Sequence, residues 1–201
     1  MAVQMHPVMT IEAFDAFVDL PENRERTFEF IAGRAVEVPS NPFASKIAGI
    51  IFGEIYIWLK SNDIGHLTGA DGGYMVDGER YAPDVAFIRY EKQPELAQKG
   101  YNPTPPDLVA EVISDPDNAQ EQEDLRIKIS HYLAAGTTVW VFNHAKQQVE
   151  VHQPGTSLRM LGADDTLDGG DNFDTVDYSG SMAGITVVLD GMTLGSGGDA
   201  D

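Results

Sequence analysis

The chain has 201 residues, 42% of them apolar, and a formal net charge of −19 at pH 7. This length fits one domain with an appendage, and the absence of cysteine excludes disulfides, thiolate zinc sites and a cysteine nucleophile. No apolar run approaches the roughly 20 residues that span a bilayer, and the N-terminus does not resemble a secretory signal. We therefore expect a cytoplasmic protein with no membrane partner.

The acidic charge is distributed unevenly along the sequence. Residues 161–201 contain nine aspartates and no lysine or arginine, so about half of the excess charge lies in the last fifth of the chain. The remaining body is still acidic, which argues against broad, unspecific adhesion to nucleic acid. Any nucleic-acid site would therefore need a local basic patch or a metal ion.

The first third of the sequence predicts a helix, a β-hairpin and a second helix. Thr10 is placed to cap a short amphipathic helix, and residues 26–40 suit two strands around the turn at 32–33. Residues 44–62 suit a long, mostly buried helix with Asn41 or Ser45 near its start. We expect Phe28 and Phe30 to share one face of their strand, with Glu29 on the opposite face.

The remaining elements are strands and one further helix. Short strands are expected around residues 65–70 and 72–78, and a buried strand within 82–90. Residues 118–136 predict a helix that Asn118 caps and Gly136 ends, and a strand hairpin follows it. The expected buried stripe of this helix is Leu125, Ile129, Tyr132 and Leu133. The order of elements predicts an α/β or α+β domain in which helices flank a mixed β-sheet.

A glutamate lies inside a second buried strand, within residues 105–118, PPDLVAEVISDPDN. Side chains alternate along a strand, so Leu108 and Val112 would face one side, and Glu111 with Ile113 the other. Both faces are otherwise apolar, which is typical of a strand covered on both sides. An ionised carboxylate there would cost several kcal/mol, roughly, unless it is paired, metal-bound or protonated.

Two Pro-Asp steps introduce the two buried strands. Asp107 begins the strand of Glu111, and we interpret it as ordinary turn chemistry at a solvated strand end. Asp84 begins the neighbouring strand, where its carboxylate and that of Glu111 would repel each other unless a hard divalent cation lies between them. Mg²⁺ takes oxygen ligands of this kind, usually one or two carboxylates with waters and phosphate.

Lys128 is the candidate cation beside these carboxylates. Asp124, Lys128 and Tyr132 lie at positions i, i+4 and i+8, so they share one side of the predicted helix. Lys128 could reach over the sheet toward Glu111. Spacing alone favours the alternative of a surface Asp124–Lys128 pair, worth only about 0.3–0.5 kcal/mol.

Several stretches together resemble a known family. The segments PDVAFI, PPDLVAEVIS and LRIKISHYLAAGTTVWVFN, with FEFIAGRAVEV before them, are similar to the Uma-two family of restriction-endonuclease-like proteins. That family belongs to the PD-(D/E)XK nuclease superfamily. The resemblance covers roughly residues 8–170 and implies a restriction-endonuclease-like core.

The resemblance assigns roles to individual residues. Asp84 matches the Asp of the PD motif, Glu111 the acid of the second motif, and Glu29 an additional acid. The superfamily's lysine normally follows the second acid by two residues, and here that position is Ile113. In Uma-two proteins a lysine on the next helix is thought to replace it, and Lys128 matches that position.

The activity that the resemblance implies is Mg²⁺-dependent hydrolysis of DNA phosphodiester bonds. Asp84 and Glu111 would bind the metal, and Lys128 would steady the nucleophile or the charge developing on phosphorus. A homodimer is compatible with this activity, and the sequence does not decide between a monomer and a dimer. The arginines nearest to these motifs in sequence are candidates for phosphate contacts, although each more often provides ordinary surface charge: Arg24, Arg26, Arg34, Arg80 and Arg89.

A second class of function competes with the enzyme. The acidic body and the missing lysine at position 113 favour a catalytically inactive nuclease-like fold that serves as a binding or interaction module. Retention of Glu29, Asp84, Glu111 and Lys128 together favours the nuclease.

The end of the chain differs from the rest in composition. The phrases DTLD at 165–168 and DTVD at 174–177 lie nine residues apart around a Gly-Gly step. This pattern resembles the calcium-binding β-roll repeats of RTX proteins. We expect a nuclease domain over residues 1–163 and an acidic appendage over 164–201. Such repeats need about three or more copies to build a core, so we expect weak Ca²⁺ binding or none.

Overall fold

A computed structural model describes residues 8–38, 41–162, 176–177 and 186–187. Its larger sheet is six-stranded, with the order β10-β9-β8-β7-β6-β3. Only β7 and β8 run parallel, so the sheet is mixed, as expected. The strands of this sheet are β3 Gly65–Gly69, β6 Val85–Arg89, β7 Leu108–Val112, β8 Thr138–Asn143, β9 Gln148–His152 and β10 Arg159–Leu161.

A smaller antiparallel sheet has the order β2-β1-β5-β4, and the sequence analysis did not separate it from the larger one. Its strands are β1 Phe28–Ile31, β2 Arg34–Glu37, β4 Tyr74–Val76 and β5 Glu79–Tyr81. The β1–β2 turn at Ala32 and Gly33 uses two positive φ angles, of 48° and 79°. Two positive φ angles are typical of a two-residue hairpin turn, because they match the twist of the two strands that the turn joins.

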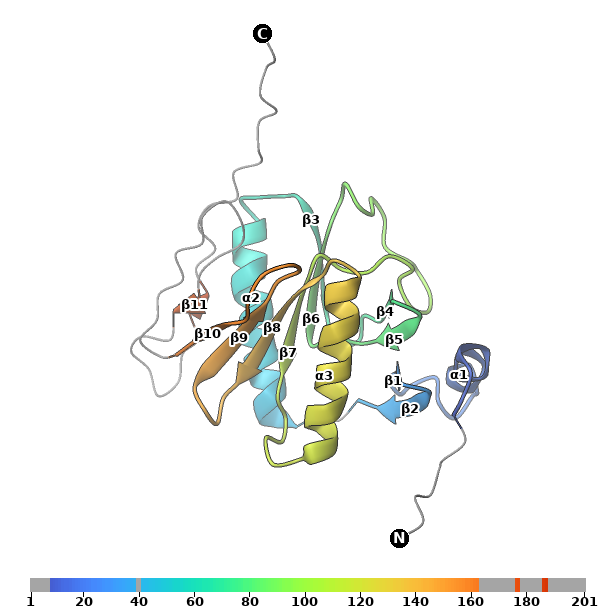
Figure 1. The fold of residues 1–201 in the computed structure, drawn as a ribbon. Coiled ribbons are helices and arrows are strands. Elements are labelled where there is room, and N and C mark those ends of the chain that lie inside the picture. The colour runs from blue at the N-terminus through green and yellow to red at the C-terminus, as the bar shows by residue number, and fades with distance from the viewer. Residues whose placement is uncertain (1–7, 39–40, 163–175, 178–185, 188–201) are drawn as a thin grey trace.

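Two helices cover opposite faces of the larger sheet (Figure 1). Helix α2, Pro42–Leu59, packs with Leu108, Ala110 and Val112 in one apolar cluster. Helix α3, Ala119–Ala134, belongs with Val109 and Ile113 to the cluster on the other face. The strand of Glu111 is therefore covered on both sides, with the alternation that the sequence predicted.

The smaller sheet lies between α3 and the short helix α1, Ile11–Val18. Phe28 and Phe30 pack toward α1 together with Phe14. Ile31 belongs to the cluster of α3 instead. Since residues alternate along β1, Glu29 lies on the same side of the sheet as Ile31 and points toward α3.

The buried stripe of α3 differs from the expected one. The buried residues of the helix are Asp124, Lys128 and Tyr132, whereas Leu125 and Ile129 are only partly buried. The polar stripe is buried because it lies against Glu111 and the smaller sheet. The caps are as predicted: the side chain of Asn118 accepts hydrogen bonds from the first turn, and Gly136 follows the helix with φ +82°.

Helix α2 begins at the predicted cap Asn41 but is less buried than expected. Phe43, Tyr56 and Ile57 remain 52%, 53% and 63% exposed. By length and composition alone this helix could cross a membrane, which the sequence reading had excluded. Its buried face packs on the sheet, as that of a core helix does.

The acidic appendage lies almost wholly outside the described residues. Within it the structure describes one antiparallel pair, β11 Val176–Asp177 with β12 Thr186–Val187. The two phrases at 165–168 and 174–177, which resemble calcium-binding repeats, fall outside the described residues, apart from β11.

Candidate active site

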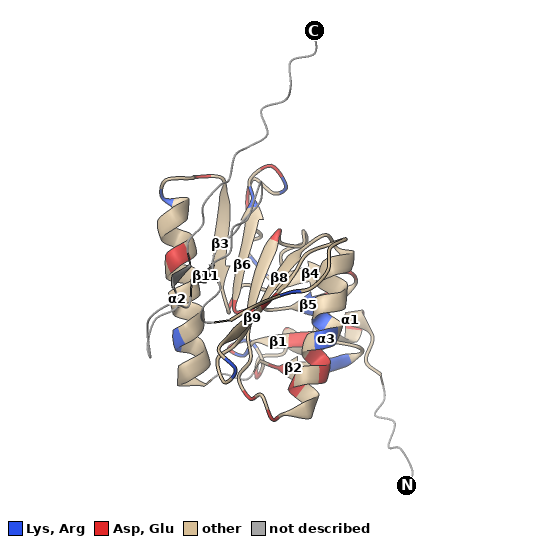
Figure 2. Cartoon of the chain, turned by 60° about the vertical axis from the view of Figure 1, so that its left-hand side comes forward, with Lys and Arg blue, Asp and Glu red and all other residues tan. Residues whose placement is uncertain are grey.

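The four residues expected at the site come together from four elements. Glu29 lies on β1, Asp84 directly precedes β6, Glu111 lies on β7 and Lys128 on α3, and all four line one pocket of about 420 Å³. Segments coloured for acidic and basic residues lie close together where α3 meets β1 and β2 (Figure 2). The pocket therefore lies between the two sheets and the helix.

Lys128 is the partner that the buried glutamate requires. Its Nζ lies 2.8 Å from Oε1 and 3.0 Å from Oε2 of Glu111, and 2.7 Å from Oε1 of Glu29. The three side chains are only 8–9% exposed. The alternative of a surface Asp124–Lys128 pair is wrong, because Asp124 instead accepts hydrogen bonds from Arg34 and Gln120.

Backbone hydrogen bonds orient two of the carboxylates. Oδ2 of Asp84 accepts the Val112 N–H at 2.7 Å, which ties the start of β6 to the end of β7. Oε1 of Glu29 accepts the Ala82 N–H at 2.8 Å. The carboxylates are therefore positioned by main chain and do not depend on each other's side chains.

Tyr132 is a member of the cluster that the sequence analysis assigned only to the core. Its hydroxyl donates to Oε1 of Glu111 at 3.2 Å, and the side chain is fully buried. Tyr81 packs against Tyr132 with 5.2 Å between ring centroids, and the amine of Lys128 lies 5.8 Å from the Tyr81 ring. The sequence feature that could have predicted this role is the position of Tyr132 one turn after Lys128, on the same side of the helix.

Two buried carboxylates, those of Glu29 and Glu111, share the Lys128 amine, and the half-buried Asp84 lines the same pocket. Burial raises the pKa of Glu111, and Lys128 offsets that effect only in part. Burial also raises the pKa of Asp84, against the lowering effect of its hydrogen bond from Val112. Burial lowers the pKa of Lys128, but Glu111 and Glu29 raise it by more, so its amine stays protonated. The pocket therefore holds fewer positive charges than carboxylates.

These residues fit a divalent cation. Asp84 and Glu111 offer hard oxygen donors, and the negative charge that Lys128 leaves uncompensated matches what such an ion supplies. Within the described part of the chain, no three acidic or histidine side chains are placed to hold a metal by themselves. A cation bound here would need further oxygen ligands, and Mg²⁺ usually keeps waters and substrate phosphate beside one or two carboxylates.

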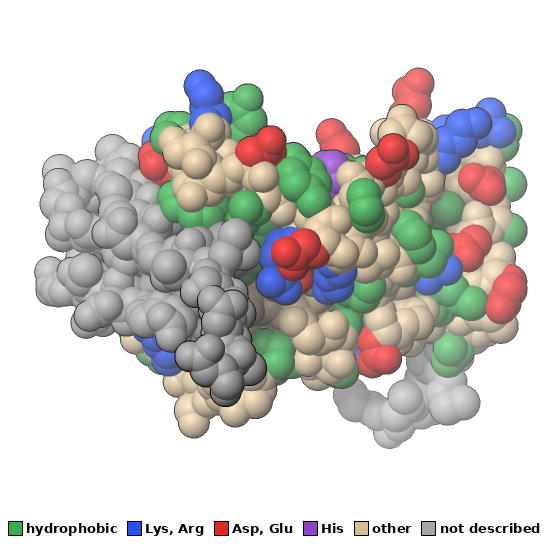
Figure 3. Space-filling model, turned by 90° about the horizontal axis from the view of Figure 1, so that it is seen from above, with side chains coloured by type: hydrophobic (Ala, Val, Ile, Leu, Met, Phe, Trp, Pro, Cys, Tyr) green, Lys and Arg blue, Asp and Glu red, His purple; other side chains and the backbone are tan. Residues whose placement is uncertain are grey.

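The arginines proposed for phosphate contacts are mostly engaged with acidic residues. Arg26 pairs with Glu37, Arg34 with Asp124, and Arg80 with Asp15, while Arg24 donates to a backbone carbonyl. On the face shown in Figure 3, basic and acidic side chains alternate with apolar ones. Pairing of this kind leaves the arginines less free to bind a phosphate chain.

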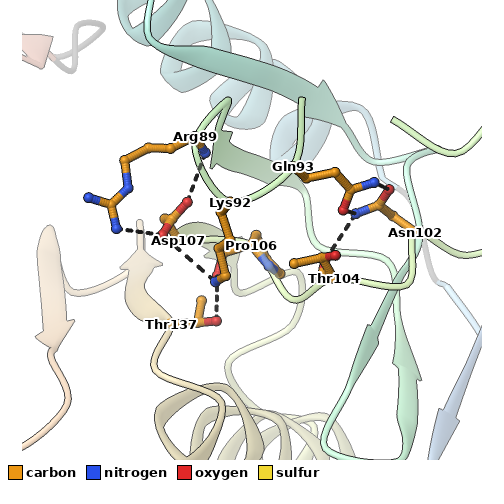
Figure 4. Close-up of polar contacts among 8 residues, drawn as sticks. All are labelled: Arg89, Lys92, Gln93, Asn102, Thr104, Pro106, Asp107 and Thr137. Carbon is orange, nitrogen blue, oxygen red and sulfur yellow. Dashed lines mark hydrogen bonds and ion pairs between the residues drawn. The ribbon is translucent and has the colours of Figure 1, made fainter. Parts of the chain in front are cut away.

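The second Pro-Asp step has a structural role, and its carboxylate is not simply solvated. Asp107 accepts hydrogen bonds from the backbone N–H of Arg89 at 2.8 Å and from its guanidinium at 3.0 Å. Lys92 lies 3.7 Å from the same carboxylate and also donates to the carbonyl of Pro106 (Figure 4). Asp107 directly precedes β7, whereas Glu111 lies near the end of that strand, so the two sites are separate.

Comparisons with known proteins agree with this architecture. The profile of the Uma2 family, described as "Putative restriction endonuclease", matches residues 14–177. A crystal structure of "a putative nuclease belonging to DUF820 from Anabaena variabilis" superposes with a TM-score of 0.61 at 23% identity. That match covers 81% of this chain and 87% of the other, and it establishes the nuclease-like fold. No curated protein matches the chain.

Proposed function

Because the chain belongs to the Uma2 family of restriction-endonuclease-like proteins, we propose that it is a Mg²⁺-dependent endonuclease that hydrolyses DNA phosphodiester bonds. The family membership supports a nuclease function. The finer proposal rests on one observation: Lys128 is buried between Glu29 and Glu111, in a pocket that Asp84 also lines. Such a cluster has more carboxylates than positive charges, which lowers folding stability. This arrangement suits a site that binds a cation together with a substrate phosphate.

Each residue has a defined role in this proposal. Asp84 and Glu111 would hold Mg²⁺, which when bound polarises the phosphate and lowers the pKa of a coordinated water. Asp84 is held in place by the Val112 N–H, and Glu111 by Tyr132. Glu29 keeps one side of the Lys128 amine engaged.

Lys128 acts through its charge. Its raised pKa keeps the amine protonated at neutral pH, so it cannot serve as a general base. Its N–H donors can instead stabilise negative charge that develops on the phosphate oxygens. The position of the amine in the pocket substitutes for the lysine that the superfamily motif places at residue 113, where this chain has a buried isoleucine.

A catalytically inactive binding module is the second candidate. The tight pairing of Lys128 with two carboxylates favours it, since an amine held in this way is less available to a substrate. Mg²⁺ titration separates the two candidates, because a binding module would retain DNA without cleaving it at any metal concentration.

The test is cleavage of plasmid and single-stranded DNA across a Mg²⁺ titration, with Asp84→Asn as the variant and Asp107→Asn as its matched control. Both aspartates follow a proline and directly precede a strand of the same sheet. We expect Asp84→Asn to lower the cleavage rate by about 10²-fold or more, because the Mg²⁺ that would stabilise transition-state charge loses one of its two carboxylate ligands. Asp107→Asn should change folding stability only. Equal rates for the wild type and Asp84→Asn would reject the proposed site.

A further inference from the structure

An exposed aromatic residue lies beside the rim of the pocket. Phe43, in the first turn of α2, is 52% exposed, and its ring contacts that of His144 with 4.8 Å between centroids. His144 belongs to the turn between β8 and β9, so two separate elements build the aromatic pair. His144 therefore holds the exposed Phe43 ring in place, and contact of that apolar area with water is unfavourable unless a ligand covers it.

The topology places this pair at the same edge of the sheet as the proposed site. Strands β7 and β8 run parallel, with Val112 opposite Phe142, so the ends of both strands meet at one edge. Ser114 follows β7 and lines the pocket, and Asn41, which caps α2, donates from its side chain to the Ser114 carbonyl at 3.3 Å. Phe43 is the second residue after Asn41. The aromatic pair is therefore a neighbour of the pocket rim.

Two lysines flank the pair. Lys46 lies three residues after Phe43 on α2 and so shares its side of the helix. Lys146 lies in the turn of His144, where its backbone N–H bonds the side chain of Asn143 at 3.1 Å. Both side chains are exposed, and neither forms an ion pair with any residue that the structure describes. They contrast with the paired arginines elsewhere on this acidic chain.

We propose that Phe43 and His144, with Lys46 and Lys146, form a stacking platform for an unpaired nucleobase next to the phosphate that enters the pocket. This inference rests on the proposed function and names its substrate: a single strand, a flap or a frayed end. Bases within an intact duplex are stacked on each other, so an aromatic side chain can cover a base only where it is unpaired. The two lysines would contact the phosphates on either side of that base.

The platform has a matched control on the same helix. Tyr56 is 53% exposed and lies thirteen residues from Phe43 in sequence, about 20 Å along the helix axis. Truncation of either ring removes a similar exposed aromatic surface. Phe43 lies two residues from Asn41, which lines the pocket, whereas Tyr56 lies fifteen residues from Asn41. Phe43→Ala should therefore weaken binding of nucleic acid, and Tyr56→Ala should not.

The experiment measures binding of a fluorescent oligothymidine and of a duplex of equal length by anisotropy, with the full chain and without Mg²⁺ so that no strand is cut. We expect single strands to bind more tightly than duplex, and Phe43→Ala to weaken single-strand binding by about 5- to 150-fold. Phe43→Trp should restore binding, while Tyr56→Ala should leave it unchanged. The double variant Lys46→Ala, Lys146→Ala should lower the slope of log K against log salt by about 1.4.

The results separate this inference from the proposed function. Equal binding by Phe43→Ala and Tyr56→Ala, a preference for duplex, or no single-strand binding by the wild type would overturn the platform. Phe43-dependent binding without cleavage in Mg²⁺ would support the platform and reject the endonuclease. Cleavage that does not depend on Phe43, on single strands and flaps alike, would support the endonuclease and reject the platform.

Discussion

Replacement of Glu111 by glutamine tests the electrostatics of the pocket without removing side-chain volume. The change removes one buried negative charge while Lys128 keeps its contact with Glu29 at 2.7 Å. The glutamine oxygen can still accept a hydrogen bond from the amine. We therefore expect the variant without metal to be as stable as the wild type at neutral pH, or more stable.

The size of the effect depends on pH in a defined direction. Burial raises the pKa of Glu111 above its ordinary value of 4.5. Protonated Glu111 therefore makes its full contribution to the unfolding free energy of the wild type below pH 4.5. The wild type loses that contribution as the pH rises through the raised pKa. Each pKa unit corresponds to about 1.4 kcal/mol of unfolding free energy. For a chain of this length, 1 kcal/mol shifts Tm by about 2–4 °C. The advantage of Glu111→Gln should therefore be small at pH 5 and grow to several degrees at pH 9.

Thermal unfolding followed by circular dichroism in EDTA at pH 5, 7 and 9 measures this difference. Glu95→Gln, in the exposed loop before β7, is the control for loss of a surface charge and should follow the wild type at each pH. A loss of Tm in Glu111→Gln that is the same at all three pH values would refute the reasoning. It would mean that Glu111 acts as a needed partner of Lys128, with no excess of negative charge in the pocket. The same variant should lose Mg²⁺-dependent cleavage.

Three further outcomes are expected. Lys128→Met should lower the unfolding free energy by about 3–5 kcal/mol at pH 8 and by less at pH 5, because the raised pKa of Glu111 leaves that carboxyl protonated at the lower pH. An equal loss at both pH values would contradict this prediction. Tyr132→Phe should weaken Mg²⁺ binding by calorimetry about tenfold, whereas Tyr74→Phe, which also removes a buried hydroxyl with one partner, should cost similar stability and leave Mg²⁺ binding unchanged. Calorimetry with Ca²⁺ should give weak binding or none, and a site tighter than about 10⁻⁵ M that is lost in Asp174→Ala would show that the acidic appendage binds calcium.

The layers of this fold were predictable because they follow from local sequence patterns, namely the alternation of apolar residues along strands and the caps of helices. Alternating apolar residues along β7 fixed which side chains face α2 and which face α3, and the caps Thr10 and Asn118 marked helix starts that the structure confirms. The separate smaller sheet was not predictable in the same way. It depends on β5, only three residues long, pairing with β1 through Phe30 and Arg80, a contact between distant segments that no local pattern reveals.

The residues of the candidate site were predictable from the sequence, whereas most of the hydrogen bonds and ion pairs between them were not. A glutamate on a strand with two apolar faces requires a partner, but spacing alone favoured a surface Asp124–Lys128 pair. The family resemblance was what assigned the role to Lys128. Spacing on α3 placed Lys128 and Tyr132 on one side, but hydrophobicity assigned the buried stripe to Tyr132 with Leu125, Ile129 and Leu133. Of these four residues only Tyr132 is fully buried. That assignment failed because a stripe of charged residues can be buried when distant segments supply its partners. The bonds of Asp124 with Arg34 and of Asp107 with Arg89 have the same origin.

The most direct test of the central claim is a crystal structure of the full chain soaked in Mn²⁺, with anomalous scattering used to locate the ion. The account predicts one strong peak in the pocket, at coordination distance of about 2 Å from a carboxylate oxygen of both Asp84 and Glu111. The Lys128 amine should remain beside Glu29. A protein that binds Mn²⁺ elsewhere, or that cleaves DNA in Mn²⁺ while this pocket shows no peak, would contradict it.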